Sequence, residues 1–162
     1  MCWTDGSRSD DGGVGAAAVC KHGNHRRSRQ CYLGTARMEV FDAEWWAIRL
    51  ALEVGKGKRE LLQDRGVETV AVFSDSLAAI RWTAHLGPGP GQRLARQMYR
   101  RVRAPLAHCV ATEIHCVPGH SGIPGNKEAD RQPNLAREGR GSTVRERPYT
   151  SALSRARRIS EG

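Results

Sequence analysis

Two aspartates stand where neighbouring strands of an α/β sheet would bring them together. Asp5 follows the first short strand-like segment, and Asp75 closely follows the apolar run of residues 69–73. In open α/β sheets, ligands bind beyond the carboxyl ends of the strands. If these two strands are neighbours, the two carboxylates converge and could bind a divalent cation.

A third and a fourth carboxylate extend this set. Glu44 precedes Ala47 and Ile48 by three and four residues, so it heads the apolar stripe of a helix predicted over residues 42–54. A carboxylate on a core-facing stripe is costly unless it is paired or bound to a metal. Asp130, near the start of the last predicted helix, is the fourth candidate.

The chemistry open to these four residues is that of a hard divalent cation. Like charges gathered so closely would not all stay ionised without a cation. Ligands that are all oxygen select Mg²⁺ first and Mn²⁺ next. Two such ions about 4 Å apart can serve in-line displacement at a phosphoryl group.

Each acidic residue also has a simpler interpretation when it is taken alone. Asp5 with Gly6 is a common turn pair, and Asp75 could cap a helix. Asp130 could be a solvated helix residue, and Glu44 could pair with an arginine. The combination of the four favours metal binding over four separate explanations.

The alternation of apolar and polar residues predicts the elements that position these side chains. Strands are expected to end near Thr4 and to cover residues 14–21, 30–38, 69–73 and 112–117. Helices are expected over residues 42–54, 76–86 and 92–107 and from Asn126 onward. Residues 21–29 are predicted to form a polar hairpin tip, and Ser74 to cap the second helix. This order predicts an α/β fold with a mixed sheet, in which an antiparallel meander precedes strands joined by helical crossovers.

Composition predicts one basic globular domain. The chain has 162 residues and a net charge of +9, a balance that favours a polyanionic partner such as nucleic acid. No apolar run approaches the length of about 18 residues that a membrane span needs, so no membrane partner is expected. Residues 1–138 are expected to form the domain, and residues 139–162 a basic, poorly ordered extension.

The five cysteines are odd in number and form no C-x-x-C pair, which favours reduced thiols in an intracellular compartment, cytoplasm or nucleus. Four residues near the predicted hairpin, Cys20, His22, His25 and Cys31, are of the types that bind zinc. Their spacing fits no common zinc finger, so a solvated basic turn is the preferred interpretation.

Four segments carry a resemblance to a known family. They are T-D-G-S at residues 4–7, F-D-A-E-W-W-A-I at 41–48, F-S-D-S-L-A-A-I at 73–80, and V-P-G-H-S-G-I-P-G-N-K-E-A-D at 117–130. In order and spacing the chain resembles the retroelement branch of the ribonuclease H family over residues 3–138. The sequences of these segments are similar to those of fungal non-LTR retrotransposon polyproteins, in which this domain follows a reverse transcriptase.

The resemblance implies a fold, a reaction and a site. The implied fold is a five-stranded mixed β-sheet flanked by α-helices. The implied reaction is endonucleolytic hydrolysis of the RNA strand of RNA–DNA hybrids with two Mg²⁺ ions, Mn²⁺ being possible. The implied metal ligands are Asp5, Glu44, Asp75 and Asp130, with His120 as a catalytic group in a mobile loop. Substrate contacts are expected at Gly6, Ser7 and Asn126, through 2′-hydroxyl groups in the minor groove.

The chain departs from the family pattern at four places. The first strand is expected to be truncated, since only three residues precede Thr4. Pro133 stands where the family helix continues, and a proline in a helix interior costs about 3 kcal/mol. Cys116 stands where the family usually has tryptophan, and Lys127 where glutamate is common.

These departures keep an alternative open, a catalytically inactive remnant that still binds nucleic acid through its basic surface. Another alternative is an integrase or transposase core of the same superfamily. That class expects a D-D-E arrangement without the H-S-G-I-P-G-N loop, so the loop argues against it.

Overall fold

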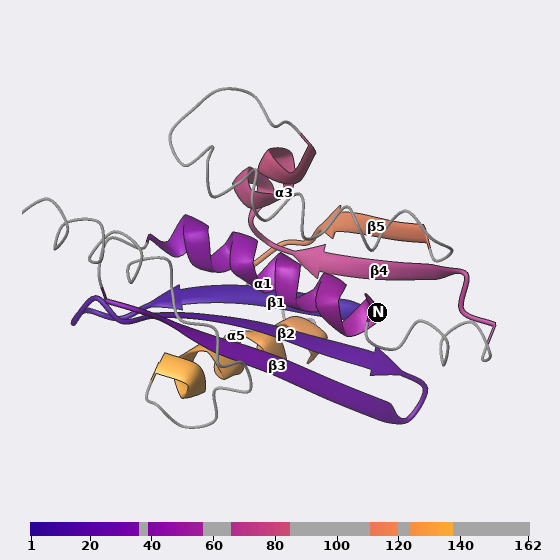
Figure 1. Ribbon diagram of the computed structural model, residues 1–162, viewed down its shortest axis with the longest axis horizontal. Coiled ribbons are helices and arrows are strands. Elements are labelled where there is room, and N and C mark those ends of the chain that lie inside the picture. Colours follow the sequence, from indigo (N-terminus) through magenta and orange to yellow (C-terminus); the bar gives the residue numbers. More distant parts are fainter. Residues whose placement is uncertain (36–38, 57–65, 85–110, 120–123, 138–162) are drawn as a thin grey trace, which may run out of the picture.

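The computed structural model describes residues 1–35, 39–56, 66–84, 111–119 and 124–137. These residues form five strands and three helices, shown in Figure 1. The strands are β1 (Cys2–Arg8), β2 (Val14–His22), β3 (His25–Gly34), β4 (Thr69–Ser74) and β5 (Ala111–Cys116). The helices are α1 (Val40–Lys56), α3 (Leu77–Ala84) and α5 (Pro124–Arg137). The predicted mixed five-stranded sheet with flanking helices is confirmed.

The sheet has the strand order β3-β2-β1-β4-β5. The first three strands form an antiparallel meander, and β1 pairs with β2 along its whole length, from Cys2↔Cys20 to Arg8↔Val14. The β1–β4 and β4–β5 pairs are parallel. Parallel neighbours need a crossover connection, and α1 lies in the chain between β3 and β4, as predicted. The central strand β1 therefore joins the antiparallel and parallel halves of the sheet.

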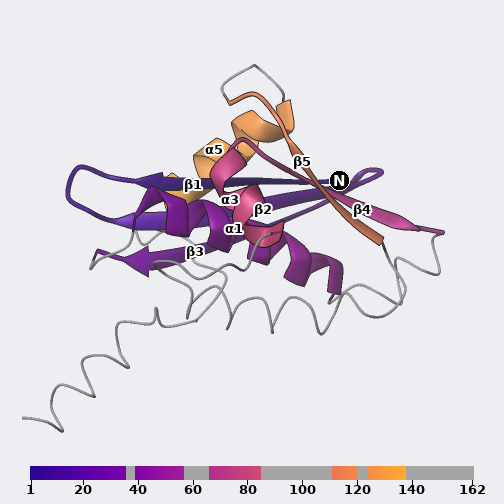
Figure 2. The same ribbon diagram turned by 90° about the horizontal axis from the view of Figure 1, so that it is seen from above.

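Helices cover both faces of the meander. Figure 2 shows α1 on one side of β1–β3 and α5 on the other. Every residue from Ala43 to Ala51 is buried, including the predicted stripe of Ala47 and Ile48. Burial of a larger apolar side chain such as Ile48 or Leu50 contributes roughly 1.5–3 kcal/mol, so α1 contributes substantially to the core beside the site-bearing strand β1. None of the helices in the described ranges has the length and apolar character needed to cross a bilayer.

Several predicted boundaries are corrected. Residues 21–29, predicted as a hairpin tip, mostly extend β2 and β3, and only Gly23 and Asn24 lie between the two strands. Helix α3 is capped by Ser76, whose Oγ accepts the backbone N–H of Ala79, while the predicted cap Ser74 accepts the N–H of Ser76. The predicted helix over 92–107 and the predicted extension over 139–162 lie outside the described residues.

The departures from the family pattern do not interrupt the described elements. Helix α5 continues through Pro133 to Arg137, and Pro133 is fully buried. Cys116 is exposed at the end of β5, so no buried gap surrounds it among the described residues, and Lys127 is exposed on α5. The first strand, expected to be short, is a seven-residue strand because it continues through Arg8.

The cysteine prediction is wrong in part, because a disulfide joins Cys2 and Cys20. The two residues lie directly opposite each other on β1 and β2, a proximity that cysteine counting does not reveal. Of the other described cysteines, Cys31 is buried and Cys116 is exposed. The disulfide consumes one of the four candidate zinc ligands, and within the described residues the only group placed to hold a metal ion is acidic. The zinc interpretation is therefore rejected.

Candidate metal centre

Asp5 and Asp75 lie at the point where two parallel strands separate. The last β1–β4 pair is Trp3↔Phe73, and each aspartate comes two residues after its member of that pair. The Thr4 hydroxyl donates a hydrogen bond to the Phe73 carbonyl oxygen, holding the strands together just before they diverge. The two acidic side chains therefore lie at one level, and the predicted convergence is present. Asp75 follows the carboxyl end of its strand as predicted. Asp5, which was expected just past the end of its strand, lies inside β1 because that strand continues through Arg8.

Glu44 approaches from α1. It is only 7% exposed, and its Oε2 atom is buried with no hydrogen-bond partner in the part of the chain that the structure describes. A Cβ atom added to Gly6 would overlap the Glu44 backbone nitrogen, so only glycine lets α1 lie this close to β1. The alternative in which Glu44 pairs with an arginine finds no such ion pair among the described residues.

Three of the four predicted carboxylates are brought together. Asp5, Glu44 and Asp75 each offer an oxygen atom, and these atoms lie within 4.8 Å of one another. Asp75 does not act as the α3 cap, since Ser76 fills that position. Residues 5, 44 and 75 therefore converge from β1, α1 and the end of β4, although 70 positions of chain separate the first from the last.

Burial and mutual repulsion raise the proton affinity of this group. Loss of hydration raises the pKa of Asp5 to about 7, and the charges of Asp130 and Asp75 add to the rise. Loss of hydration likewise raises the pKa of Glu44 to about 9, with Asp5 and Asp75 contributing. A hydrogen bond from the Gly6 backbone acts in the opposite direction on both carboxyls. The cluster is thus poorly stable as a set of bare anions.

Asp130 lies beside this cluster. It is half-buried on α5, and its charge raises the pKa of both Asp5 and Glu44. It does not belong to the set of three whose oxygens lie within 4.8 Å. The predicted four-residue arrangement is therefore present as a close trio with a fourth acid near enough to interact electrostatically.

Of the other predicted site residues, the structure describes Gly6 and Ser7 fully, Asn126 in part and His120 not at all. Gly6, expected to let the backbone approach the substrate, lies against α1, and its backbone forms a hydrogen bond with the carboxylates. The Ser7 hydroxyl oxygen is buried without a hydrogen-bond partner among the described residues. Asn126 lies within α5, and its side chain is outside the described part. His120 lies outside the described residues.

Gly119 is a site neighbour that sequence reasoning did not single out. A Cβ atom added to it would lie 2.8 Å from Asp75 Oδ2, so the loop after β5 passes directly over this carboxylate. The signal was present in the sequence, because Gly119 precedes His120 in the segment P-G-H-S-G. The loop therefore reaches the carboxylates at a residue without a side chain.

The carboxylates fit a hard divalent cation. All three donors are oxygens, and a cation would satisfy the orphaned Glu44 Oε2 atom while offsetting the repulsion that raises both pKa values. Mg²⁺ and Mn²⁺ favour such carboxylate sites. Without a cation, the ionised trio would carry the full cost of buried like charges.

Comparison with known proteins agrees with the fold. Residues 1–140 match the family described as RNase H. A crystal structure of RNase H1 from the archaeon Halobacterium salinarum NRC-1 is similar, with a TM-score of 0.61 and 20% identity over 85% of this chain and 96% of that one. The structure of LC11-RNase H1, isolated from compost by a metagenomic approach, is also similar. It has a TM-score of 0.63 and 21% identity over 85% of this chain and 94% of that one. A search of curated proteins found no match. Since the family match spans most of its length, this chain belongs to the RNase H family and is by class a ribonuclease H.

Proposed function

We propose that the chain hydrolyses the RNA strand of RNA–DNA hybrids by a two-metal mechanism, with Asp5, Glu44, Asp75 and Asp130 as the metal ligands. The observation that carries the proposal is the trio of carboxylate oxygens within 4.8 Å of one another, in a chain of the RNase H family. Raised pKa values at two members support it, because perturbed carboxyls cluster at functional sites.

Mg²⁺ or Mn²⁺ bound at these carboxylates would supply Lewis-acid activation of water and neutralise charge on the scissile phosphate. The protein's own contribution is positional. The Gly6 backbone hydrogen bond favours the ionised form of Asp5 and Glu44, and the Thr4–Phe73 bond fixes the strands that carry Asp5 and Asp75. These contacts hold the ligands in place before substrate arrives, which lowers the cost of assembling the site.

The remaining assignments rest on the motif positions. His120 is proposed to carry a proton during the reaction or product release, and it directly follows Gly119, which lies against Asp75. Ser7 and Asn126 are proposed to contact the hybrid. Their part would be to contact 2′-hydroxyl groups in the minor groove of the hybrid.

A retroelement origin, with a reverse transcriptase once joined to this domain and an intracellular place of action, is also proposed. The sequences of the four matching segments, above all V-P-G-H-S-G-I-P-G-N-K-E-A-D, support this origin. Such a domain would remove template RNA after its DNA copy has been made.

Cleavage of a labelled RNA–DNA hybrid tests the function. Wild-type protein is expected to cut the RNA strand only with Mg²⁺ or Mn²⁺. Asp75→Asn keeps the side-chain size but removes one charged ligand, and we expect the rate to fall about a thousandfold, equivalent to roughly 4 kcal/mol of lost transition-state stabilisation. Asp42→Asn, an acid at the start of the same helix α1 that carries Glu44 but outside the cluster, is the matched control and should retain activity.

The result also separates the second candidate, an inactive nucleic-acid binder. If wild-type protein is folded, as judged by its circular dichroism spectrum, but leaves the RNA intact in every metal condition, the proposed hydrolysis is overturned. Hybrid binding that weakens steeply with salt in that same protein would then identify the inactive binder.

A further inference from the structure

The β2–β3 hairpin concentrates positive charge at the end of the sheet away from the carboxylates. Residues 21–29 hold four basic side chains and two histidines and no acid: Lys21, His22, His25, Arg26, Arg27 and Arg29. All residues from 21 to 28 are exposed. The rest of the described chain has no comparable run, and the acidic trio lies elsewhere in the fold.

The hairpin projects past its neighbour in the sheet. The β1–β2 ladder ends at Cys2↔Cys20, whereas β2 and β3 continue with Lys21↔Arg26 and His22↔His25. In Figure 1 this two-stranded tip extends beyond the amino end of β1. Met1 still forms backbone hydrogen bonds with Lys21, and beyond Lys21 no described strand lies beside the ribbon. The side chains of residues 21–28 are exposed, so they are accessible to a partner.

Two of the four basic residues are held by acids of the fold. Arg26 pairs with Glu128 on α5, and Arg29 pairs with Glu53 on α1. These pairs tie the hairpin to the helices on the two faces of the sheet. They explain why Arg26 and Arg29 are basic without any external partner.

Lys21 and Arg27 have no such explanation. Neither forms an ion pair among the described residues. Lys21 lies directly opposite Arg26, and like charges at opposite positions of an antiparallel pair are destabilising. Arg27 lies opposite Cys20 and therefore on the other face, because successive residues alternate. The tip thus presents one uncompensated cation on each face.

We infer that the β2–β3 hairpin is a second contact for nucleic acid, in which Lys21 and Arg27 bind backbone phosphates of the hybrid at a distance from the cleaved bond. The inference rests on the proposed function, since the partner is the same duplex. Phosphates suit these cations in charge, and a two-stranded ribbon with a cation on each face can lie between two phosphate rows. His22 follows Ala17, the partner of Asp5, by five residues, which places the tip about 17 Å along the strand from the level of Asp5.

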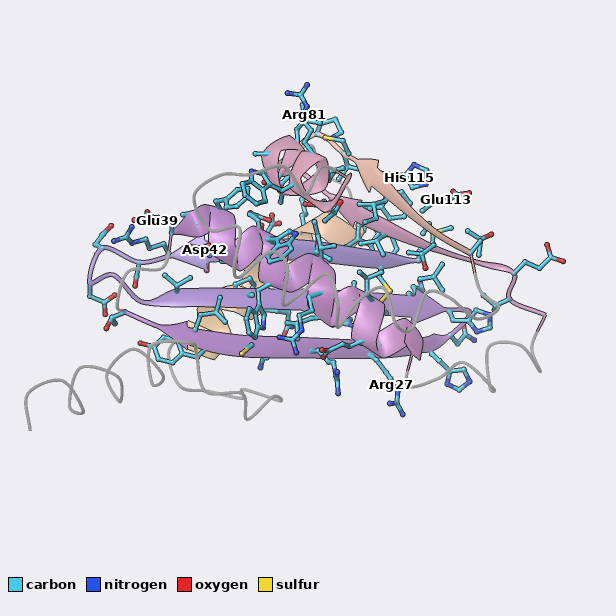
Figure 3. All side chains as sticks on the ribbon, turned by 45° about the horizontal axis from the view of Figure 1, so that its top comes forward. Arg27, Glu39, Asp42, Arg81, Glu113 and His115 are labelled. Carbon is cyan, nitrogen blue, oxygen red and sulfur yellow. A yellow bond between two sulfur atoms is a disulfide. The ribbon has the colours of Figure 1, made fainter. Side chains whose placement is uncertain are left out.

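The experiment measures binding rather than cleavage. The probe is an RNA–DNA hybrid of about 24 base pairs, long enough at about 3.4 Å per pair to span both regions. Dissociation constants are measured by fluorescence anisotropy in EDTA over a series of KCl concentrations. The pair of variants to compare is Arg27→Gln and Arg81→Gln, two exposed arginines that each lose one charge. Figure 3 shows Arg27 beside the hairpin and Arg81 beyond α3 on the opposite side of the molecule.

We expect Arg27→Gln to raise Kd about threefold at low salt and to reduce the salt slope by about one. The Lys21→Gln/Arg27→Gln double variant should raise Kd about tenfold and reduce the slope by about two. Arg81→Gln should bind as wild type does. Arg27→Lys keeps the charge and should restore binding, which covers the case in which a glutamine variant folds poorly.

Equal effects of Arg27→Gln and Arg81→Gln would overturn the inference, because only total charge would then matter. So would unchanged binding in the double variant, or lost binding in Arg27→Lys. The outcomes are distinct from those for catalysis. If wild type cleaves the hybrid but the hairpin variants bind normally, the inference fails and the function stands. If the hairpin variants lose affinity while no condition yields cleavage, the function fails and the contact stands.

Discussion

Like charge gathers beyond both ends of the short β1–β4 pairing, but in different surroundings. Beyond its carboxyl end, which we call the acidic end, Asp5 meets Glu44 and Asp75 between a diverging strand pair and a buried helix. Beyond its amino end, which we call the basic end, Lys21 lies opposite Arg26 on an exposed ribbon. Two unit charges about 4 Å apart interact by about 1 kcal/mol in water and about 4 kcal/mol near a protein surface of lower effective dielectric. The same arrangement of like charge is therefore costly at the acidic end and mild at the basic end.

This difference separates two ways of preparing a protein for an ionic partner. The acidic end stores repulsion that a small divalent cation can relieve at short range, and the high pKa values of Asp5 and Glu44 are its signature. The basic end keeps its charges hydrated and available to a large polyanion, whose affinity then depends on salt. The three expected outcomes below test the contrast, from the largest effect to the smallest.

The largest effect is expected from pH in the absence of divalent cations. The pKa of Asp5, about 7, and that of Glu44, about 9, exceed those of an unfolded chain, so between about pH 4 and pH 9 the folded protein binds more protons than the unfolded one. The free energy of unfolding should therefore be highest at the low-pH limit of this window and fall as pH rises through it, by at least about 4 kcal/mol. Urea unfolding followed by circular dichroism measures it.

Two further measurements connect that fall to the carboxylates. Asp75→Asn removes one source of repulsion on both residues and should flatten the pH dependence. Added Mg²⁺ should restore stability most at high pH, where the ligands are ionised. Stability that is level across the window, or a pH dependence that Asp75→Asn leaves unchanged, would contradict the repulsion described at this end.

A smaller effect is expected from crowding the acidic end. Gly6→Ala places a methyl group against the Glu44 backbone, so α1 must move away from β1. We expect a loss of about 2 kcal/mol in unfolding free energy, typical of overpacking, with reduced cleavage because Glu44 moves with the helix. Urea unfolding and the hybrid cleavage assay provide the two measurements.

The matched control lies in the hairpin. Gly23 has a φ of +55° and nothing within 4 Å of an added Cβ atom, so Gly23→Asn faces open space in a conformation that asparagine tolerates. It should cost less than about 1 kcal/mol. Equal losses for the two variants would show that β1 and α1 are not as closely packed as described.

The smallest effect is expected at the basic end. Lys21→Glu replaces a like-charge pair with an opposite-charge pair across from Arg26, and should stabilise the fold by about 0.5 kcal/mol at low salt. Thermal unfolding measures the change, which should vanish in about 1 M salt because the charges are exposed. Lys21→Gln should lie between the wild type and Lys21→Glu. A destabilised Lys21→Glu would mean that Lys21 makes a contact inside the fold.

The acidic site was predictable residue by residue to different degrees. The position of Glu44 at the head of an apolar helical stripe predicted its burial, because periodicity alone identifies the face that packs on the sheet. The placement of Asp75 followed from its position after an apolar strand, whereas Asp5 lies inside β1, which continues through Arg8. The contact of Gly6 with α1 was not predicted, since it depends on how closely a helix and a strand approach. The Cys2–Cys20 disulfide was missed for a similar reason, because it depends on register.

By itself, the sequence determined which residues carry charge, where helices and strands form, and which faces are apolar, because those properties arise from side chains and their spacing over a few positions. Only the tertiary structure decided that β1 and β4 separate just after Trp3 and Phe73, that Gly119 lies over Asp75, and that Lys21 and Arg27 are left without acid partners in the described chain. Such facts depend on which distant segments become neighbours, and on how much water remains between them, which no local pattern specifies.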